Sequence, residues 1–540
     1  MSEVPQIIVV GSGASAVVAA ARVLDAGLRV LMLDSGDVDN HYGKLVPERS
    51  FADLRRNDAD QHRYLLGQDS EGIDLGGTGP LAQATAPRRF VFRRALQRLH
   101  TSGDAFAAVE SLARGGLAEA WGAGAFPFTA HELARAGLDA GEMAPHYEAV
   151  AREIGISGAR DDLAPWLGPL AALQPPLPMD DNAAALMAAY ERRKPQLARL
   201  GVRLGRPLLA VLSEGLGERR ANPLHGLDFW SNAGGSVFRP SVLLADLMHR
   251  PGFEYRGQLL VTRFDEEASG AVRVTATDLQ AGAQASFTAH HLLLCAGALG
   301  TTRIVLRSTG HYDQPVPLVC NEHAYIPSVR WRGLGAAPSG RSHALAQLTA
   351  LLDPTGDQQH LVQAQFYSFT GMLLARLLKD SPLGYRDSLR IFQALASSFV
   401  ILGVQHEDVA SPGKHLMLRR GPVPDDDVLE IRWRPGAAEQ AAQDAALRRF
   451  CEAIRLLGCW PLRVVRPGAG SSVHYAGMLP FADEDRPLTL HRSGLLRGTR
   501  SVYVCDGAGL EYLPAKGPTL TLMANARRIA SGLVQSLSEP

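Results

Sequence analysis

The sequence predicts a mixed α/β fold, in which a parallel sheet built from both ends of the chain carries an inserted antiparallel sheet. Near the start, a strand, a glycine-rich turn, a helix and a second strand follow one another from Ile7 to Asp34. At the end, a strand and a glycine turn lead into a long helix between Ser501 and Leu533. Between them, residues 311–435 hold about six β-rich runs with few crossover helices, which is typical of antiparallel strands.

The first turn, Gly11 to Ala16, has the G-x-G-x-x-A pattern of a Rossmann-like, dinucleotide-binding unit. Gly11 permits the tight turn, Gly13 lets a pyrophosphate approach the backbone, and Ala16 lets the helix pack closely on the sheet. Ala14 and Ser15 open that helix, whose unpaired N–H groups face the phosphates. We therefore expect these five residues to contact a dinucleotide.

A carboxylate follows at the expected distance. Asp34 ends the second strand, 21 residues after Gly13. An acidic side chain about 20 residues past the turn binds ribose hydroxyls and disfavours a 2′-phosphate, so NADP is not expected. Incidental glycines in an ordinary strand–turn–helix are the alternative, but strands, helix and acid in register favour dinucleotide binding. The motif leaves NAD and FAD both open.

Composition narrows the function classes. The 540 residues are 46% hydrophobic and 20% charged, with a formal net charge of zero, which is normal for a globular protein. We see no long basic tract, so nucleic acid is not an expected partner. No apolar run approaches the ~20 residues of a membrane span, and the first strand starts too close to Met1 for a signal peptide, so we expect a cytoplasmic protein. The five cysteines, an odd number without a C-x-x-C pair, predict no disulfide framework and no metal site.

The middle of the chain alternates between helices, strands and loops. Residues 36–113 are expected to be irregular, with a plain loop at Gly76 to Gly79. Residues 113–128 place four glycines around Trp121, and they either hold backbone against something flat or form a tight turn packed by that side chain. Patterns predict helices at 130–155, 182–200, 371–380 and 437–457, a hairpin at 258–264 and 271–277, and a strand at 290–295.

Polar side chains also fall on the predicted antiparallel strands. Gln363 and Gln365 share one face of their strand, because side chains alternate along it. With Gln405 and His406, they either line a substrate face or meet solvent.

Five motifs, in this order, resemble the glucose–methanol–choline (GMC) oxidoreductases: GSGASA with Asp34, GGLAEAWGAG, CAGALGTTRIVL, HYAG and CDGAGLEYLPAKGPTLTLMANARRIA. Together they span nearly the whole chain. The resemblance implies FAD rather than NAD, and non-covalent FAD because no His occurs within 115–121. It implies three parts of an FAD-binding domain at 1–165, 166–310 and 461–540, and a substrate-binding domain at 311–460.

The resemblance also implies roles for individual residues. Gly11, Gly13 and Asp34 would hold the pyrophosphate and the adenosine ribose. The remaining expected cofactor residues are Gly116, Trp121, Gly122 and Gly124 along the flavin, Val261 near adenine, Asp506 and Gly507 near the ribityl chain or pyrophosphate, and Pro518 and Thr519 by the pyrimidine edge.

The H-x-x-G loop of the family corresponds to His474, which would be the general base. Oxidation of an alcohol removes a hydride, which flavin N5 accepts, and a hydroxyl proton. A neutral imidazole, with an ordinary pKa near ~6.5, can accept that proton at physiological pH. The expected substrate is a small molecule with a hydroxyl group. Sugars, secondary-metabolite alcohols and lipid alcohols all fit, and the electron acceptor and oligomeric state stay open.

One departure from the family pattern affects the predicted reaction. Where the family usually has Asn or His before the proline of its last motif, this chain has Gly517. The departure permits two alternatives: a net non-redox flavin-bound lyase, decarboxylase or isomerase, or a flavoprotein-like binding protein with an inactive site. The adjacent Lys516 either points into the site or, as the more ordinary account, lies exposed beside the start of the last helix.

Overall fold

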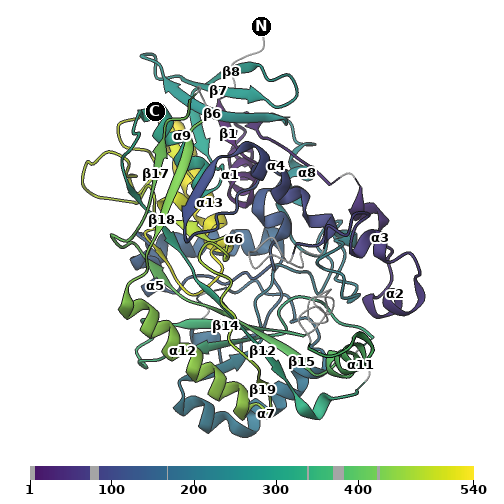
Figure 1. The fold of residues 1–540 in the computed structure, drawn as a ribbon. Coiled ribbons are helices and arrows are strands. Elements are labelled where there is room, and N and C mark those ends of the chain that lie inside the picture. The colour runs from purple at the N-terminus through teal and green to yellow at the C-terminus, as the bar shows by residue number, and fades with distance from the viewer. Residues whose placement is uncertain are drawn as a thin grey trace.

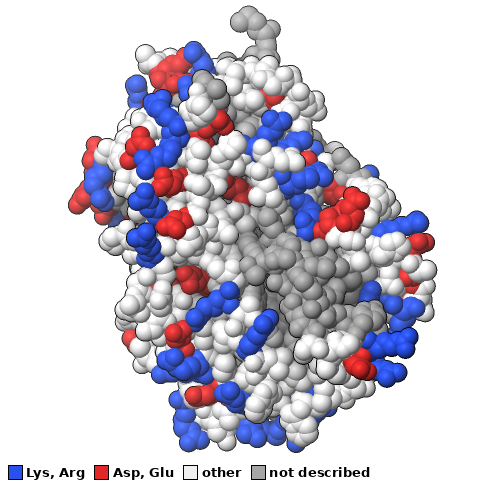
Figure 2. Space-filling model, in the orientation of Figure 1, with Lys and Arg blue, Asp and Glu red and all other residues white. Residues whose placement is uncertain are grey.

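The computed structural model describes residues 6–39, 41–72, 84–166, 168, 170–336, 340–368, 382–422 and 426–539. Figure 1 shows a parallel sheet with its helices in the upper half and a larger sheet, backed by two long helices, in the lower half. Acidic and basic side chains are interspersed over the face seen in Figure 2. None of the described helices combines the length and apolar character that a membrane span needs.

The parallel sheet draws its five strands from distant parts of the chain. Their order is β21-β9-β1-β2-β5, and every neighbouring pair is parallel. The strands are β1 (Ile7–Val10), β2 (Val30–Leu33), β5 (Phe253–Arg256), β9 (His291–Leu294) and β21 (Val502–Val504). The mixed α/β class predicted from the sequence is therefore confirmed.

Helices from both ends of the chain pack beside this sheet. The alanine-rich α1 (Ala14–Asp25) contacts α13 (Thr519–Ser538) and α8 (Pro240–Leu247), and α13 also contacts α6 (Ala140–Ile154). Ala16, Ala19 and Ala20 are fully buried in α1, because methyl side chains allow neighbouring elements to approach closely. This packing fixes the first turn relative to the last helix.

The second large sheet has six strands in the order β19-β12-β15-β14-β13-β4. They are β4 (Val202–Gly205), β12 (His323–Val329), β13 (Leu348–Leu352), β14 (Val362–Ser368), β15 (Phe399–Gln405) and β19 (Trp460–Pro461). Alternate residues such as Ile326, Leu402 and Phe366 form a buried apolar cluster with α7 (Asp181–Arg199) and α12 (Ala437–Leu456). The residues between them face the opposite way.

Smaller sheets accompany the two large ones in the described part of the chain. One joins β10 (Val316–Pro317), β17 (Lys414–Arg419), β18 (Val428–Trp433) and β3 (Thr101–Asp104), and another joins β6 (Leu259–Glu266), β7 (Val272–Asp278) and β8 (Gln284–Ala289). Two short pairs are β11 (Val319–Cys320) with β20 (Tyr475–Ala476) and β16 (Asp408–Val409) with β22 (Tyr512–Leu513). The short pairs hold the C-terminal section against segments next to the six-stranded sheet.

Several predictions of local structure need correction. Residues 36–113 are not simply irregular, since they include α2 (Phe51–Asn57), α3 (His62–Leu65), α4 (Phe90–Arg98) and β3. The single helix predicted at 130–155 is divided into α5 (Ala130–Arg135) and α6. Helices this short carry little periodic signal. The loop at Gly76–Gly79 and the helix at 371–380 lie outside the described residues.

The predicted single antiparallel sheet over 311–435 is also wrong in its extent. β17 and β18 leave it and pair with β10 and β3, while β4 joins it from outside the range. The cause is pairing between strands far apart in sequence, which local patterns do not report. The predicted hairpin is confirmed as β6 and β7, which are antiparallel. The domain ranges themselves stay predictions.

The apolar face of the six-stranded sheet gives a stability prediction. Leu402→Ala on β15 should lower the free energy of unfolding by about 2–5 kcal/mol, because the fully buried Leu402 side chain would leave a cavity against α7 and α12. Chemical denaturation measures this. Leu96→Ala is the matched control, since Leu96 is 64% exposed. Equal effects of the two substitutions would contradict the predicted core.

Candidate functional site

The first turn leaves open backbone at the carboxyl ends of the parallel strands. Gly11 has φ +94°, and a Cβ built on it would lie 2.5 Å from the carbonyl oxygen of Cys295. A Cβ on Gly13 would meet no atom closer than 3.9 Å, and one on Gly297 would meet nothing within 4 Å. Gly13 and Gly297 precede α1 and α9 (Ala298–Thr309), so two helix N-termini border this open space.

Asp34 lies beside the turn, as its spacing predicted. The Ser12 hydroxyl donates to Asp34 Oδ2 at 2.6 Å, and the Tyr255 hydroxyl donates to the same oxygen at 2.9 Å. Burial raises the pKa of Asp34 to about 6, although these hydrogen bonds oppose the shift. Ser12 also accepts from the backbone N–H of Gly115 at 2.9 Å, which joins the first turn to the 115–124 segment.

The 115–124 segment runs from the first turn to the six-stranded sheet. A Cβ on Gly116 would lie 3.5 Å from Gly13 Cα, and one on Gly124 would lie 3.2 Å from Gln365 Nε2. Trp121 turns into the protein, where its indole N–H donates to the carbonyl of Phe238 at 2.8 Å. This contact favours the packing alternative for Trp121, while Gly122 and Gly124 present backbone toward the sheet.

The remaining expected cofactor residues lie close to the same edge. Asp506 follows β21 and caps the short turn that begins at Gly507. It accepts hydrogen bonds from the Thr301 hydroxyl and from the backbone N–H of Ala508. Burial raises the pKa of Asp506 to about 6. Val261 lies on β6, which is tied to Asp34 by a backbone hydrogen bond from Leu259 N–H at 2.9 Å. Pro518 and Thr519 start α13.

His474 is oriented by a residue that the sequence analysis missed. The side chain of Asn321 donates through Nδ2 to the carbonyl oxygens of His406 at 2.8 Å and Pro514 at 2.9 Å. Its Oδ1 therefore faces His474 Nδ1, 3.2 Å away, and can only accept, so Nδ1 carries the proton. The Nε2 atom of the neutral His474 ring is then an acceptor.

We call the open backbone around Gly11, Gly13 and Gly297, together with the 115–124 segment, the cradle. His474 lies where this cradle and the six-stranded sheet meet. A Cβ on Gly517 would lie 4.0 Å from His474 Cε1 and 3.5 Å from the Gly124 carbonyl oxygen. The ring of His323, from β12, is perpendicular to that of His474 with centroids 5.8 Å apart. Burial, and then the charge of His323, lower the pKa of His474 to about 3, so the ring is neutral at physiological pH.

The sheet face opposite α7 and α12 is polar. Register and alternation place the following side chains on it: His323, Tyr325, Thr349, Gln363, Gln365, Tyr367 and Gln405. Gln363 is fully buried and Gln365 is 7% exposed, so the solvent alternative for them was wrong. Within the described part of the chain, both polar atoms of Gln363 lack a hydrogen-bond partner, as do Gln405 Oε1 and Thr349 Oγ1.

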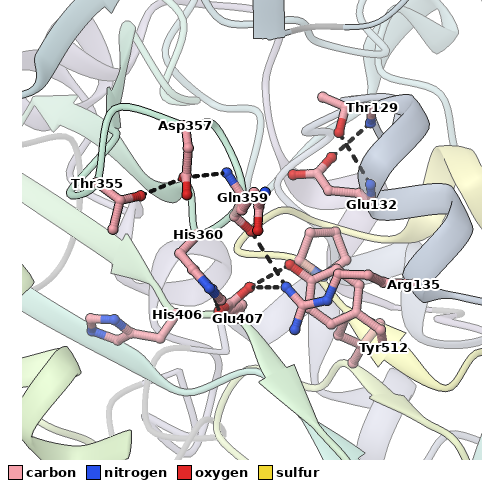
Figure 3. A network of polar contacts seen from close by, with 12 residues as sticks. Thr129, Glu132, Arg135, Thr355, Asp357, Gln359, His360, His406, Glu407 and Tyr512 are labelled. Carbon is pink, nitrogen blue, oxygen red and sulfur yellow. Dashed lines mark hydrogen bonds and ion pairs between the residues drawn. The ribbon is translucent and has the colours of Figure 1, made fainter.

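Lys516 matches neither account predicted for it. The side chain is 1% exposed and points toward α5, where Nζ donates to Glu132 Oε2 at 2.7 Å and to the Trp166 carbonyl at 3.1 Å. It therefore anchors the segment before Gly517. Figure 3 shows Glu132 near a second link between α5 and the sheet, in which Arg135 donates to Glu407 at 2.9 Å.

The chain is similar in sequence to known enzymes over nearly its whole length. No family model matches the chain. Paromamine 6'-oxidase of Streptomyces fradiae is 25% identical over 556 residues, covering 98% of this chain and 91% of the relative. The 6'''-hydroxyparomomycin C oxidase of Streptomyces lividus is 24% identical over 569 residues, covering 98% and 92%.

Two solved structures share the fold. Pyridoxine 4-oxidase from Mesorbium loti is 16% identical with a TM-score of 0.58, covering 98% of this chain and 99% of that one. A fungal aryl-alcohol oxidase is 13% identical with a TM-score of 0.57, covering 100% of both chains. The chain is thus similar over nearly its whole length to enzymes named as oxidases.

The buried histidines predict a dependence of stability on pH. Burial lowers the pKa of His406 to about 3, so between pH 6.5 and 3 the unfolded chain binds a proton that the folded chain does not. This stabilisation is present above pH 6.5 and is lost as the pH falls. His406→Gln should therefore lose less stability than the unsubstituted protein between pH 7 and 4.5, by on the order of 2 kcal/mol.

Urea denaturation at the two pH values checks the His406 prediction. His249→Gln, at an exposed histidine, is the control and should behave like the unsubstituted protein. An unchanged pH dependence in His406→Gln would contradict the proposed effect of burial.

The cradle gives a second prediction. If this backbone holds the flavin expected from the sequence, Gly11→Ala should lower the amount bound at least about tenfold, because the new Cβ would clash with the Cys295 carbonyl oxygen and the φ of Gly11 is strained for alanine. Visible absorbance of the purified protein reports flavin content. Gly27→Ala is a matched control, with φ +75° but no atom within 4 Å of the new Cβ. Full flavin content in Gly11→Ala would place the cofactor elsewhere.

Proposed function

We propose that this protein is a FAD-dependent oxidoreductase of GMC type that oxidises a CH–OH group, with His474 as the general base. The observation that carries the proposal is the position of His474 between the cradle and the polar sheet face, with Nε2 left as an acceptor by the Asn321 contact. Similarity to enzymes named as oxidases supports the redox class.

The residues of the cradle fit a flavin dinucleotide. The open backbone at Gly13 and Gly297, next to the N-termini of α1 and α9, suits a pyrophosphate. Asp34, beside this open backbone, would bind the adenosine ribose, and the 116–124 backbone leads from there toward His474. When bound, FAD would supply the hydride acceptor, and we propose that it is held without a covalent bond.

The protein side chains would handle the proton. The substrate hydroxyl donates to His474 Nε2, the O–H bond breaks toward that nitrogen, and Asn321 Oδ1 stabilises the imidazolium through its contact with Nδ1–H. Because burial disfavours a charged ring here, the proton and the hydride should leave the substrate close together in time. The low pKa also keeps the base unprotonated before each turnover.

The substrate in this proposal is a small, polar, hydroxyl-bearing molecule. The curated relatives are named for paromamine and 6'''-hydroxyparomomycin C, and the sheet face beside His474 carries glutamine and tyrosine side chains. We therefore take paromamine as the first substrate to test. The non-redox alternative left open by Gly517 finds no support among these relatives.

His474→Ala tests the proposal. The variant should keep its bound flavin, because the substitution leaves the backbone of the cradle unchanged, but flavin reduction by substrate should slow by about 100-fold or more through loss of the base. Anaerobic stopped-flow bleaching of the flavin measures the rate.

His415→Ala, at a half-exposed histidine of β17, is the control. In this variant substrate should reduce the flavin at the rate of the unsubstituted protein. Reduction of His474→Ala at the rate of the unsubstituted protein would remove His474 from the mechanism. Product formed while the flavin stays oxidised would instead support a non-redox reaction.

A further inference from the structure

A second imidazole lies beside His474. The His323 ring stands edge-on to His474, with planes at 89° and centroids 5.8 Å apart. It opens β12 on the polar face, where it also meets the Tyr325 ring at 6.3 Å. Position 517 has no side chain to offer on this side of His474. The six-stranded sheet, rather than the segment before α13, therefore supplies the next polar side chain.

His323 has hydrogen-bonding capacity to spare. Its Nε2 atom is buried and has no partner among the described residues. Leaving a buried polar atom unpaired is destabilising, so a ligand that satisfies it gains affinity. Burial lowers the pKa of His323 to about 4, which makes the ring neutral at physiological pH, with one N–H donor and one acceptor.

The Asn321 side chain, which contacts the His474 ring, is already occupied. Asn321 uses both N–H groups on backbone carbonyls and its oxygen on His474 Nδ1. It therefore has no donor left for a substrate. His323, by contrast, keeps a ring nitrogen without a partner among the described residues.

We propose that His323 is the second imidazole of the reaction centre and orients the hydroxyl group of the substrate. This inference rests on the proposed oxidation. The His323 N–H donates to the hydroxyl oxygen, which directs the O–H toward His474 Nε2. During oxidation the O–H proton passes to His474 and the C–O bond becomes a carbonyl, while the C–H hydrogen leaves with its electron pair to the hydride acceptor that bound FAD would supply. The alcohol is oxidised, the flavin is reduced, and His323 ends with the protons it began with.

The main test replaces His323 by Phe, which keeps a ring and removes both nitrogens. With paromamine as the probe, and pyridoxine and benzyl alcohol as further probes, the limiting rate of flavin reduction should fall by about 100-fold at unchanged flavin content. His323→Gln should recover at least about a tenth of the original rate, because an amide still donates. His415→Gln, at a half-exposed histidine of β17, should stay within about threefold of the unsubstituted protein.

A double variant tests whether the His323 and His474 rings act together. If they act as a unit, the double variant His323→Phe/His474→Ala should be no slower than His474→Ala alone. Rate losses that multiply in the double variant, or a His323→Phe variant within about threefold of the original rate, would overturn the inference.

Failure of the proposed oxidation would be visible separately, as unsubstituted protein whose flavin none of the probes reduces. NMR titration of imidazole-labelled protein then tests the pairing without turnover. The pKa of His474 should rise in His323→Phe and stay unchanged in His406→Gln, since His323 contributes to lowering it. An unshifted His474 titration in His323→Phe would overturn the pairing.

Discussion

The hydrogen bond between Asn321 Oδ1 and His474 Nδ1 is the contact on which the candidate site depends. The same amide donates to the end of the six-stranded sheet, at the His406 carbonyl, and to the C-terminal segment, at the Pro514 carbonyl. One buried side chain thus fixes the tautomer of His474 and holds together the three segments that surround it. Its position follows from the β11–β20 pairing, which sets Cys320 opposite Tyr475.

The six-stranded sheet shows how strand alternation creates both stability and a site. One face contributes Ile326, Leu402 and similar side chains to a dry core with α7 and α12. The other face carries amides, phenols and an imidazole, of which Gln363 is buried without a partner among the described residues. An unpaired buried amide is destabilising. Features that destabilise the fold, such as this unpaired amide, are expected mainly at functional sites. Their presence favours the polar face of the sheet as the substrate surface.

Sequence reasoning succeeded where the signal was local. The β1–α1–β2 unit was predictable because its strands, turn and helix are contiguous, and α13 because proline precedes a long periodic run. Asn321 and His323 were missed because two-residue strands, separated by about 150 residues, bring them to His474. The direction of the Lys516 side chain was predicted wrongly, because the neighbouring Gly517 does not determine where that side chain points. Its side chain is drawn to Glu132 on α5, a contact no local pattern reports.

The spacing of the two imidazoles also limits how many protons the centre can hold. At the 5.8 Å between ring centroids, two positive charges would repel by about 3 kcal/mol at an effective dielectric constant near 20, which is roughly two pH units of titration. Burial already lowers the pKa of both rings, so His474 and His323 cannot both be protonated at physiological pH. The pair therefore holds at most one proton at a time, which equals the one hydroxyl proton released per alcohol in the proposed oxidation. That proton must leave His474 before a second substrate can donate, so proton release belongs to every turnover.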